Sequence, residues 1–470
     1  MPGRLTIVAI NTKVKRFINR WILRKLPQPL SIGIFKMYHM ITDRENKAIK
    51  ERIKSLRIDD YVEIVEKPQK NVLIITVDCL RYRNLSFTGY PRETTPFLDG
   101  LKFKYQGIST APWTYPSVAS ILTGLYPHNH GAFIDKRIKN REDLRRFKAI
   151  KQTVITLPEL MNLLGYKTYF ATPIGLAGFA FKKRTVVKFH PPEYKAESVL
   201  KEFLEWVDKN NHRRFFAYIH LGDTHQPLNP PDQYRNYFGK VKKIPNIESW
   251  DYNRPEDWEK PGFKEFKDNR MLLYDNTIRY VNDQIEWLFE EFEKRKLSDD
   301  TLIVITADHG EEFWEHAKIE AKYFYDPRGI YGVDHGHSVF SELIEVPILF
   351  YGFDELKQRD VISSVDIFPT ILYELNLKPN IYLDGYPLQI APKKRLILTE
   401  AVDYGYEKKS LIIGEFKLLH APKDGVKWIF TRKNDPFEQN PILEKEVVQV
   451  FEDKLKKILA KGNIEQSAHR

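Results

Sequence analysis

The sequence predicts an α/β protein in which helices cover both faces of a mixed, mostly parallel central sheet. Residues 71–78 and 301–308 each run through five or more apolar or β-branched residues and close on an aspartate. Such runs are typical of parallel strands that are buried on both faces. A third segment, 111–124, places Thr114 just before Pro116 and predicts a helix that begins near Thr114 and stops at Gly124.

Apolar periodicity and turn residues predict the remaining elements. The expected helices are 151–165, 271–296, 366–375 and 443–461, and the expected strands are 167–171, 215–220, 347–351, 395–398, 411–413, 416–420 and 428–431. Asp424-Gly425 lies between two of these strands and predicts a hairpin. The stretch 230–268, rich in Pro, Asn, Trp and charge, is expected to be a long irregular insertion that overhangs the functional site.

These elements divide the chain into three parts. We expect a basic extension at 1–57, a main α/β domain at 58–376, and a small α+β subdomain at 377–470 that consists of an antiparallel sheet and a closing helix. The chain has 470 residues, which is long enough for two domains.

The excess positive charge lies in the N-terminal extension. The chain holds 74 Lys and Arg against 63 Asp and Glu, and residues 1–57 hold 14 against 3, so the remainder is balanced. Apolar residues recur there at helical spacing, namely Ile10, Val14, Phe17, Ile18, Trp21 and Ile22. A basic amphipathic helix is typical of an anionic membrane surface, and a helix packed on the main domain is the alternative. Nucleic acid is not an expected partner, because the body carries no basic excess.

Composition indicates the compartment. Cys79 is the only cysteine, which excludes an intrachain disulfide and fits a reducing environment. The start lacks the pattern of a signal peptide, and no run of 18 apolar residues predicts a transmembrane helix. We therefore expect a cytoplasmic protein, attached peripherally to the inner membrane face if the extension binds lipid.

The two aspartate-terminated strands predict a metal site. Ligands of open α/β sheets bind beyond the carboxyl ends of the strands, so Asp78, Asp308 and His309 are expected to meet there. Two carboxylates and an imidazole suit a divalent cation such as Zn²⁺, Mn²⁺ or Mg²⁺. Thr114, at a helix start that favours anions, would be an activated nucleophile next to such an ion. The alternative for each aspartate and for Thr114 is a helix N-cap.

The chain resembles the sulfatase and alkaline-phosphatase superfamily. The matching segments are 77–78, 111–117, 125–131, 223–227, 308–312, 335–338 and 365–370, and they follow the family's order over roughly residues 70–440. The resemblance implies an alkaline-phosphatase-like α/β/α sandwich and an anionic ester substrate, such as a glycan, a lipid head group or a small phosphodiester.

Several departures separate the chain from formylglycine-dependent sulfatases. Those enzymes carry a C/S-x-P-x-R core, whereas here Thr114 replaces the Cys and Val118 replaces the Arg. Cys79 stands where they have a second carboxylate, and their Gly-Lys-Trp-His stretch is missing at 170–175. The chain is more similar to phosphoethanolamine transferases and lipoteichoic acid synthases, which use a threonine nucleophile.

That resemblance implies a role for each matching residue. Thr114 would be the nucleophile, and the ligands of one divalent ion (Mn²⁺, Zn²⁺, Mg²⁺ or Ca²⁺) would be Asp78, Thr114, Asp308 and His309, with a second ion left open. His225 and His335 match the family's substrate-side histidines and are candidates for protonating the leaving group. His220, His316 and His337 are expected to have structural roles or to support a neighbouring site residue. Cys79 is expected to be a buried thiol under the site, with ligation of a second metal as the alternative.

We therefore expect a metal-dependent phosphodiester hydrolase or phosphoryl-group transferase with Thr114 as nucleophile. One alternative is a sulfuric ester or phosphonate hydrolase that uses Thr114 unmodified. The other is a non-catalytic binder of anionic glycans or lipid head groups.

Overall fold

The computed structural model describes residues 45–137, 143–210 and 213–468. The amphipathic pattern predicted for the N-terminal extension lies before residue 45 and therefore outside the described residues. The last part of the extension, residues 45–55, is helical, and its Arg52 forms an ion pair with Glu159 of the main body.

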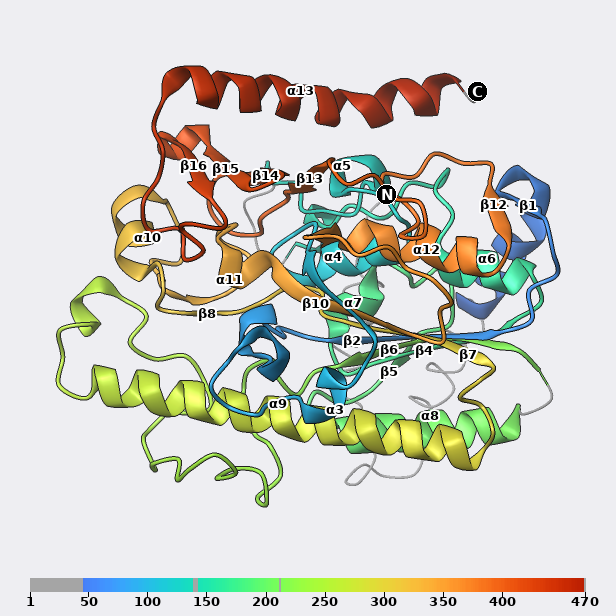
Figure 1. Ribbon diagram of the computed structural model, residues 1–470, viewed down its shortest axis with the longest axis horizontal. Helices are drawn as coiled ribbons and strands as arrows, with labels where there is room; N and C mark the ends of the chain where they lie inside the picture. Colours follow the sequence, from blue (N-terminus) through green and yellow to red (C-terminus); the bar gives the residue numbers. More distant parts are fainter. Residues whose placement is uncertain (1–44, 138–142, 211–212, 469–470) are drawn as a thin grey trace, which may run out of the picture.

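An eight-stranded mixed sheet forms the centre of the molecule, in agreement with the predicted fold class (Figure 1). Its strands, in spatial order, are β11 (Ile362–Ser363), β3 (Phe103–Ile108), β10 (Glu345–Tyr351), β7 (Thr301–Thr306), β2 (Asn71–Val77), β6 (Phe215–Leu221), β4 (Lys167–Thr172) and β5 (Lys188–Phe189). Strand β10 is antiparallel to both of its neighbours, and the other pairs are parallel. Every residue of β2, β6 and β7 is buried, which explains their continuous apolar sequences.

Helices cover both faces of this sheet (Figure 1). One face carries α3 (Pro96–Asp99), α8 (Ala196–Lys209) and α9 (Phe263–Lys294), and the other carries α4 (Thr114–Ile121), α6 (Leu157–Leu163), α7 (Gly175–Phe179) and α12 (Ile367–Glu374). The long helix α9 buries apolar residues such as Leu273, Ile285 and Phe292 against the core. The result is the predicted three-layer sandwich.

The C-terminal part forms the predicted antiparallel subdomain. Its strands β13 (Leu396–Thr399), β14 (Lys409–Ile413), β15 (Phe416–Ala421) and β16 (Val426–Thr431) pair in sequence order. Gly425 closes the β15–β16 turn with a φ of 76°, as Asp424-Gly425 predicts. The closing helix α13 (Lys445–Ala468) packs Val448, Phe451 and Leu455 on this sheet.

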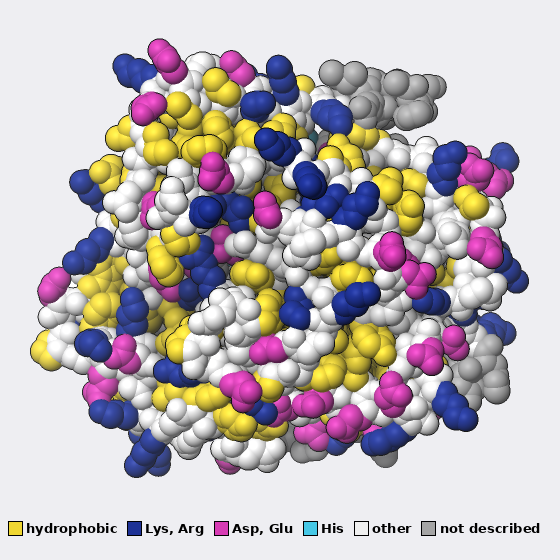
Figure 2. All heavy atoms as spheres, in the orientation of Figure 1, with side chains coloured by type: hydrophobic (Ala, Val, Ile, Leu, Met, Phe, Trp, Pro, Cys, Tyr) yellow, Lys and Arg dark blue, Asp and Glu magenta, His cyan; other side chains and the backbone are white. Residues whose placement is uncertain are grey.

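Short elements complete the described chain. They are β1 (Val62–Ile64), which pairs with β12 (Leu377–Pro379), the ladder of β8 (Glu312–Phe313) with β9 (Val333–Asp334), and the helices α5 (Pro127–His130), α10 (Ala317–Tyr323) and α11 (Ser341–Ile344). The side of the molecule in Figure 2 carries Lys and Arg interspersed with Asp and Glu. Within the described residues, every helix is too short or too polar to cross a membrane.

Two helix starts were predicted wrongly. The helix expected at 151–165 begins at Leu157, because Thr156 and Glu159 form a capping box at that point. The helix expected at 271–296 begins at Phe263, inside the stretch expected to be irregular. There the start follows Gly262, whose φ of 93° turns the chain into the helix.

Candidate active site

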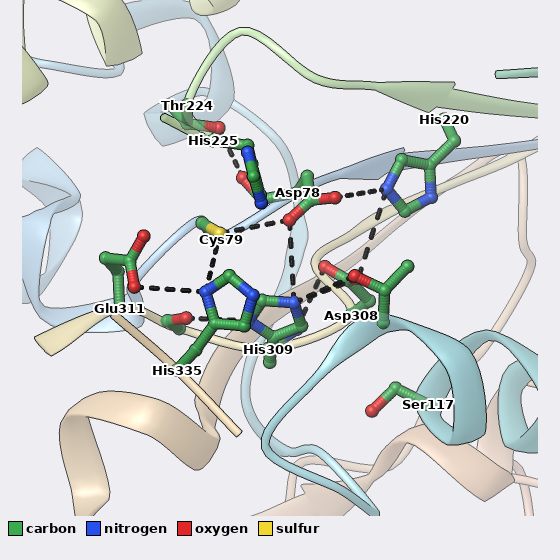
Figure 3. A network of polar contacts seen from close by, with 12 residues as sticks. Asp78, Cys79, Ser117, His220, Thr224, His225, Asp308, His309, Glu311 and His335 are labelled. Atoms are coloured by element: carbon green, nitrogen blue, oxygen red, sulfur yellow. Dashed lines mark hydrogen bonds and ion pairs between the residues drawn. The ribbon is translucent and has the colours of Figure 1, made fainter. Parts of the chain in front are cut away.

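Asp78 and Asp308 lie side by side because their strands are neighbours. Strands β2 and β7 pair in parallel, so their carboxyl ends reach the same edge of the sheet. Asp78 follows β2 directly and Asp308 follows β7 by two residues, and both carboxylates are fully buried. Figure 3 shows the two side chains and His309 converging at this edge.

The imidazole of His309 joins the four residues predicted to form the site. Its Nε2 atom lies 3.5 Å from Asp78 Oδ1, 3.3 Å from Asp308 Oδ2 and 3.2 Å from Thr114 Oγ1. The Nδ1 atom lies 2.8 Å from the carbonyl oxygen of Gly310, to which Nδ1–H donates, so the lone pair of Nε2 points into the site. The expected convergence is present, while the roles of these residues remain predictions. We call Asp78, Thr114, Asp308 and His309 the floor of the site.

Hydroxyl groups attach the start of helix α4 to the end of β7. Thr114 is the first residue of α4 and is buried. Five residues before it, Ser109 hydrogen-bonds the carbonyl oxygen of Asp308 and lies 2.9 Å from the hydroxyl of Ser117. Ser117 in turn donates to the carbonyl oxygen of Ala111 at 2.7 Å. These bonds fix the position of Thr114 relative to Asp308.

The floor residues fit a divalent cation. Among the described residues, Asp308 Oδ2 has no hydrogen-bond partner although it is buried. Burying a carboxylate oxygen without a partner is costly, and a cation would remove that cost. Donor atoms that share a tetrahedral ion at about 2.0–2.1 Å stand about 3.3 Å apart. The three distances from His309 Nε2, between 3.2 and 3.5 Å, match this spacing.

Electrostatics also favour a cation at the floor. Burial and the charge of Asp78 raise the pKa of Asp308. Burial would raise the pKa of Asp78 as well, but a hydrogen bond to His220 and the neighbouring imidazoles hold it below its ordinary value. Burial and the same carboxylates raise the pKa of Cys79 well above its ordinary value, so its sulfur is a thiol that donates to Asp78 Oδ1 at 3.0 Å. Cys79 therefore lies beneath the site as a neutral group.

His225 and His335 form the more accessible side of the site, which we call the rim. Their ring centroids lie 5.3 Å apart, and both side chains are partly exposed, whereas the floor is buried. Burial would lower the pKa of His335, but Glu311, at 3.1 Å from Nδ1, and Asp334 raise it to about 9. His225 Nδ1 donates to the carbonyl oxygen of Gln226 at 2.6 Å, which leaves Nε2 free to face a substrate.

The structure adds residues that the sequence did not single out for the site. His220, for which a structural or supporting role was expected, has its Nε2 atom 3.0 Å from Asp78 Oδ2. Glu311, rather than its neighbour Glu312, contacts His335. Thr224 hydrogen-bonds the carbonyl oxygen of Asp78. A histidine inside the otherwise apolar run 215–221 was the available signal for His220, whereas the choice between two adjacent glutamates depends on the pleat of β8.

The expected structural roles of the other two histidines agree with their surroundings. His316 Nδ1 lies 2.6 Å from Glu342, and its ring stacks on Phe340 at 3.7 Å. His337 Nε2 lies 2.9 Å from Glu312. Both histidines are buried.

Comparison with known proteins gives the family. The Sulfatase family model matches residues 70–376, which is more than half of the chain. The low-salt glycan biosynthesis sulfotransferase Agl7 of Haloferax volcanii is 26% identical over 309 residues, which cover 64% of this chain and 60% of the relative. The phosphoethanolamine transferase EptC of Escherichia coli is 23% identical over 274 residues, 53% of this chain and 41% of that protein.

A solved structure supports the fold. A 2-O GAG sulfatase superposes with a TM-score of 0.63 at 15% identity and covers 86% of this chain and 94% of its own. The chain spans about 60% or less of the length of the two curated relatives described above. The predicted superfamily is confirmed, and the chain belongs to the sulfatase family.

Proposed function

We propose that the chain is a metal-dependent phosphodiester hydrolase or phosphoryl-group transferase with Thr114 as its nucleophile. The observation that carries this proposal is the position of the Thr114 hydroxyl, 3.2 Å from His309 Nε2 and next to two buried carboxylates. Its resemblance to phosphoethanolamine transferases supports the proposal, and EptC is among its relatives.

Asp78, Asp308, His309 and the Thr114 hydroxyl would hold the divalent ion. When bound, the ion would lower the pKa of the Thr114 hydroxyl and balance the negative charge of the buried carboxylates. The start of α4 presents backbone N–H groups and the positive end of its dipole to the same place. The floor therefore supplies both a nucleophile and a place for an anionic ester.

The reaction would proceed in two displacements. Thr114 would release its hydroxyl proton to solvent when the cation binds and would attack as the alkoxide, so that Oγ1 forms a bond to phosphorus while the bond from phosphorus to the leaving oxygen breaks. The leaving alkoxide takes a proton from the rim, where His335 carries one because Glu311 and Asp334 stabilise its cation. Water or an acceptor alcohol then gives up its proton to the rim and displaces Thr114 from phosphorus. Hydrolysis and transfer differ only in that acceptor.

Sulfate chemistry is the second candidate. It is favoured by the similarity to a glycan biosynthesis sulfotransferase and by the family model itself. Against it, position 118 holds a fully buried Val where formylglycine-dependent sulfatases have Arg, and Thr114 is not a residue that conversion to formylglycine uses. Without that arginine, helix α4 has no guanidinium at the position where those sulfatases have one.

Activity on three synthetic esters separates the candidates. The purified chain is assayed with bis-p-nitrophenyl phosphate, p-nitrophenyl phosphate and p-nitrophenyl sulfate, each with Mn²⁺, Zn²⁺ and Mg²⁺. We expect the diester to be cleaved far faster than the sulfate. Sulfate cleavage that exceeds diester cleavage would establish the second candidate instead. No turnover and no bound metal would leave the binder of anionic glycans or lipid head groups as the function.

A further inference from the structure

His220 contacts the floor from the side opposite the rim (Figure 3). It is the sixth residue of strand β6, pairs in register with Thr76 of β2, and is fully buried. Its Nε2 atom lies 3.0 Å from Asp78 Oδ2, and its Nδ1 atom lies 3.0 Å from the hydroxyl of Tyr218. The histidine is thus held in a chain of hydrogen bonds that ends on a floor carboxylate.

The two oxygens of Asp78 have different surroundings. Oδ1 lies 3.5 Å from His309 Nε2 and accepts the thiol of Cys79 at 3.0 Å. Among the described histidines, only His220 lies within hydrogen-bonding distance of Oδ2. His220 Nε2 stands 3.9 Å from Asp308 Oδ2, beyond hydrogen-bonding distance. Its 3.0 Å approach to Asp78 is that of a hydrogen bond, shorter than the 3.2–3.5 Å spacing around His309 Nε2.

We propose that His220 is a positioning residue for the metal site, which donates Nε2–H to Asp78 Oδ2 and thereby directs Oδ1 toward the ion. This inference rests on the proposed function, because it concerns the ion that the floor would hold. His220 itself touches neither the ion nor the substrate.

The fold explains why this position suits a hydrogen-bond donor. Asp78 and Asp308 bring two negative charges into one buried site, so a freely rotating Asp78 would turn away from Asp308. His220 comes from the interior of a fully buried strand, and such a rigid element holds its donor in place. Groups that orient a metal ligand typically change metal affinity or activity by about 10–100-fold when they are removed.

The test measures metal affinity directly. A chelator first removes bound metal from each full-length protein, and each is then titrated with Mn²⁺ and Zn²⁺. The proteins are the wild type, His220→Phe, His220→Gln and the control His316→Gln. We expect His220→Phe to bind each ion about 10–100-fold more weakly, and His220→Gln, whose amide N–H can still donate to Asp78, to lose much less. His316→Gln removes a similar buried imidazole–carboxylate pair outside the site and should bind like the wild type.

Each outcome decides the inference. If the wild type binds an ion and His220→Phe binds it equally well, the inference is wrong and the proposed function stands. If the wild type binds no ion, the proposed function itself fails. If His220→Phe does not fold, Tyr218→Phe gives the same test, because the loss of the Tyr218 hydroxyl should weaken binding in the same direction and to a smaller extent.

The Co²⁺ spectrum separates positioning from ligation. When Co²⁺ is bound, the absorption bands of His220→Gln should match those of the wild type, because the atoms bonded to the ion are unchanged. Bands of altered number or intensity in His220→Gln would mean that Nε2 is itself a ligand, which would overturn the positioning role.

Discussion

The floor and the rim of the site contain similar side chains in different environments. The floor carboxylates and His309 are fully buried and held by strand ends and by the start of α4. The rim histidines are partly exposed and lie on the loops that follow β6 and β9. In both places carboxylates lie next to an imidazole. Of the described floor and rim histidines, however, only His309 has a threonine hydroxyl beside it.

This difference indicates a division of labour. A buried group exchanges slowly with solvent and is positioned by the sheet, so the floor suits the bond-making chemistry that is common to all substrates. A partly exposed group contacts the departing or entering alcohol, so the rim suits the part of the reaction that varies with the substrate. The following experiments test that division, in order of expected effect.

The largest effect is expected at Thr114. Thr114→Ala should reduce diester turnover by several orders of magnitude, because the nucleophile is lost. The fold should persist, since Trp113 and not Thr114 is the N-cap of α4, and the Thr114 hydroxyl contacts His309 rather than the helix backbone. Thr123→Ala removes a buried hydroxyl that hydrogen-bonds Ala119 near the end of the same helix and should remain active. Full activity of Thr114→Ala would place the chemistry elsewhere.

The next effect is expected at His335 and should depend on the leaving group. His335→Gln should slow an alkyl phosphodiester by about 10²–10⁴-fold, the usual contribution of a general acid. The loss should be much smaller for a p-nitrophenyl ester, whose phenolate departs without a proton. Steady-state rates on both esters, with His316→Gln as control, measure this difference. An equal loss on both would assign His335 to the floor chemistry instead.

A stability effect, smaller than the rate effects above, is expected at Asp308 in the metal-free protein. Burial and Asp78 raise the pKa of Asp308, so its ionised form destabilises the metal-free protein at neutral pH. Metal-free Asp308→Asn should therefore have a free energy of unfolding about 1–3 kcal/mol higher than that of the metal-free wild type, measured by urea titration. Its turnover should be lost. Added Mn²⁺ should stabilise the wild type only. A metal-free Asp308→Asn that is less stable than the wild type would show that the floor does not require a cation.

The smallest effect is expected outside the site, at His316. Burial would lower the pKa of His316, but Glu342 at 2.6 Å raises it to about 10. Because the folded-state pKa lies above the unfolded value of about 6.5, the pair stabilises the protein fully below pH 6.5 and loses this effect as the pH rises through about 10. His316→Gln should thus lower the free energy of unfolding by about 1.5–3 kcal/mol at pH 6, and by less at higher pH, without changing turnover. Urea titrations at several pH values measure it, and a loss of turnover at unchanged stability would contradict this assignment.

Much of the fold could be predicted because the central strands are buried on both faces. In β2 and β7 the apolar runs end at the sheet edge, so the aspartates after them locate the floor. The start of α6 was missed although Thr156 and Glu159 carry a capping-box signature, which outweighs the apolar pattern around it. The start of α9 was missed because its first eight residues, before Met271, are only aromatic, charged or polar, without the aliphatic residues that mark the rest of the helix.

The contacts of the site were less predictable than its elements. Asp78, Asp308 and His309 meet as expected, since parallel neighbouring strands require it. The pairing of Glu311 with His335, and of Glu312 with His337, depends on how β8 and β9 align and on the pleat of a two-residue strand. His220 stands out as a histidine in an apolar strand, but only the register of β6 on β2 shows that its partner is Asp78.

The most direct test of the central claim is to trap the covalent intermediate. The chain is mixed with a phosphodiester in molar excess, quenched in acid during the first turnovers, and digested for mass spectrometry. The account predicts one phosphoryl-containing group on Thr114, which is absent when the metal has been removed by a chelator. In Thr114→Ser, the serine at this position should carry the group instead. Turnover of the diester with an unlabelled Thr114, or with the label on another residue, would contradict the account.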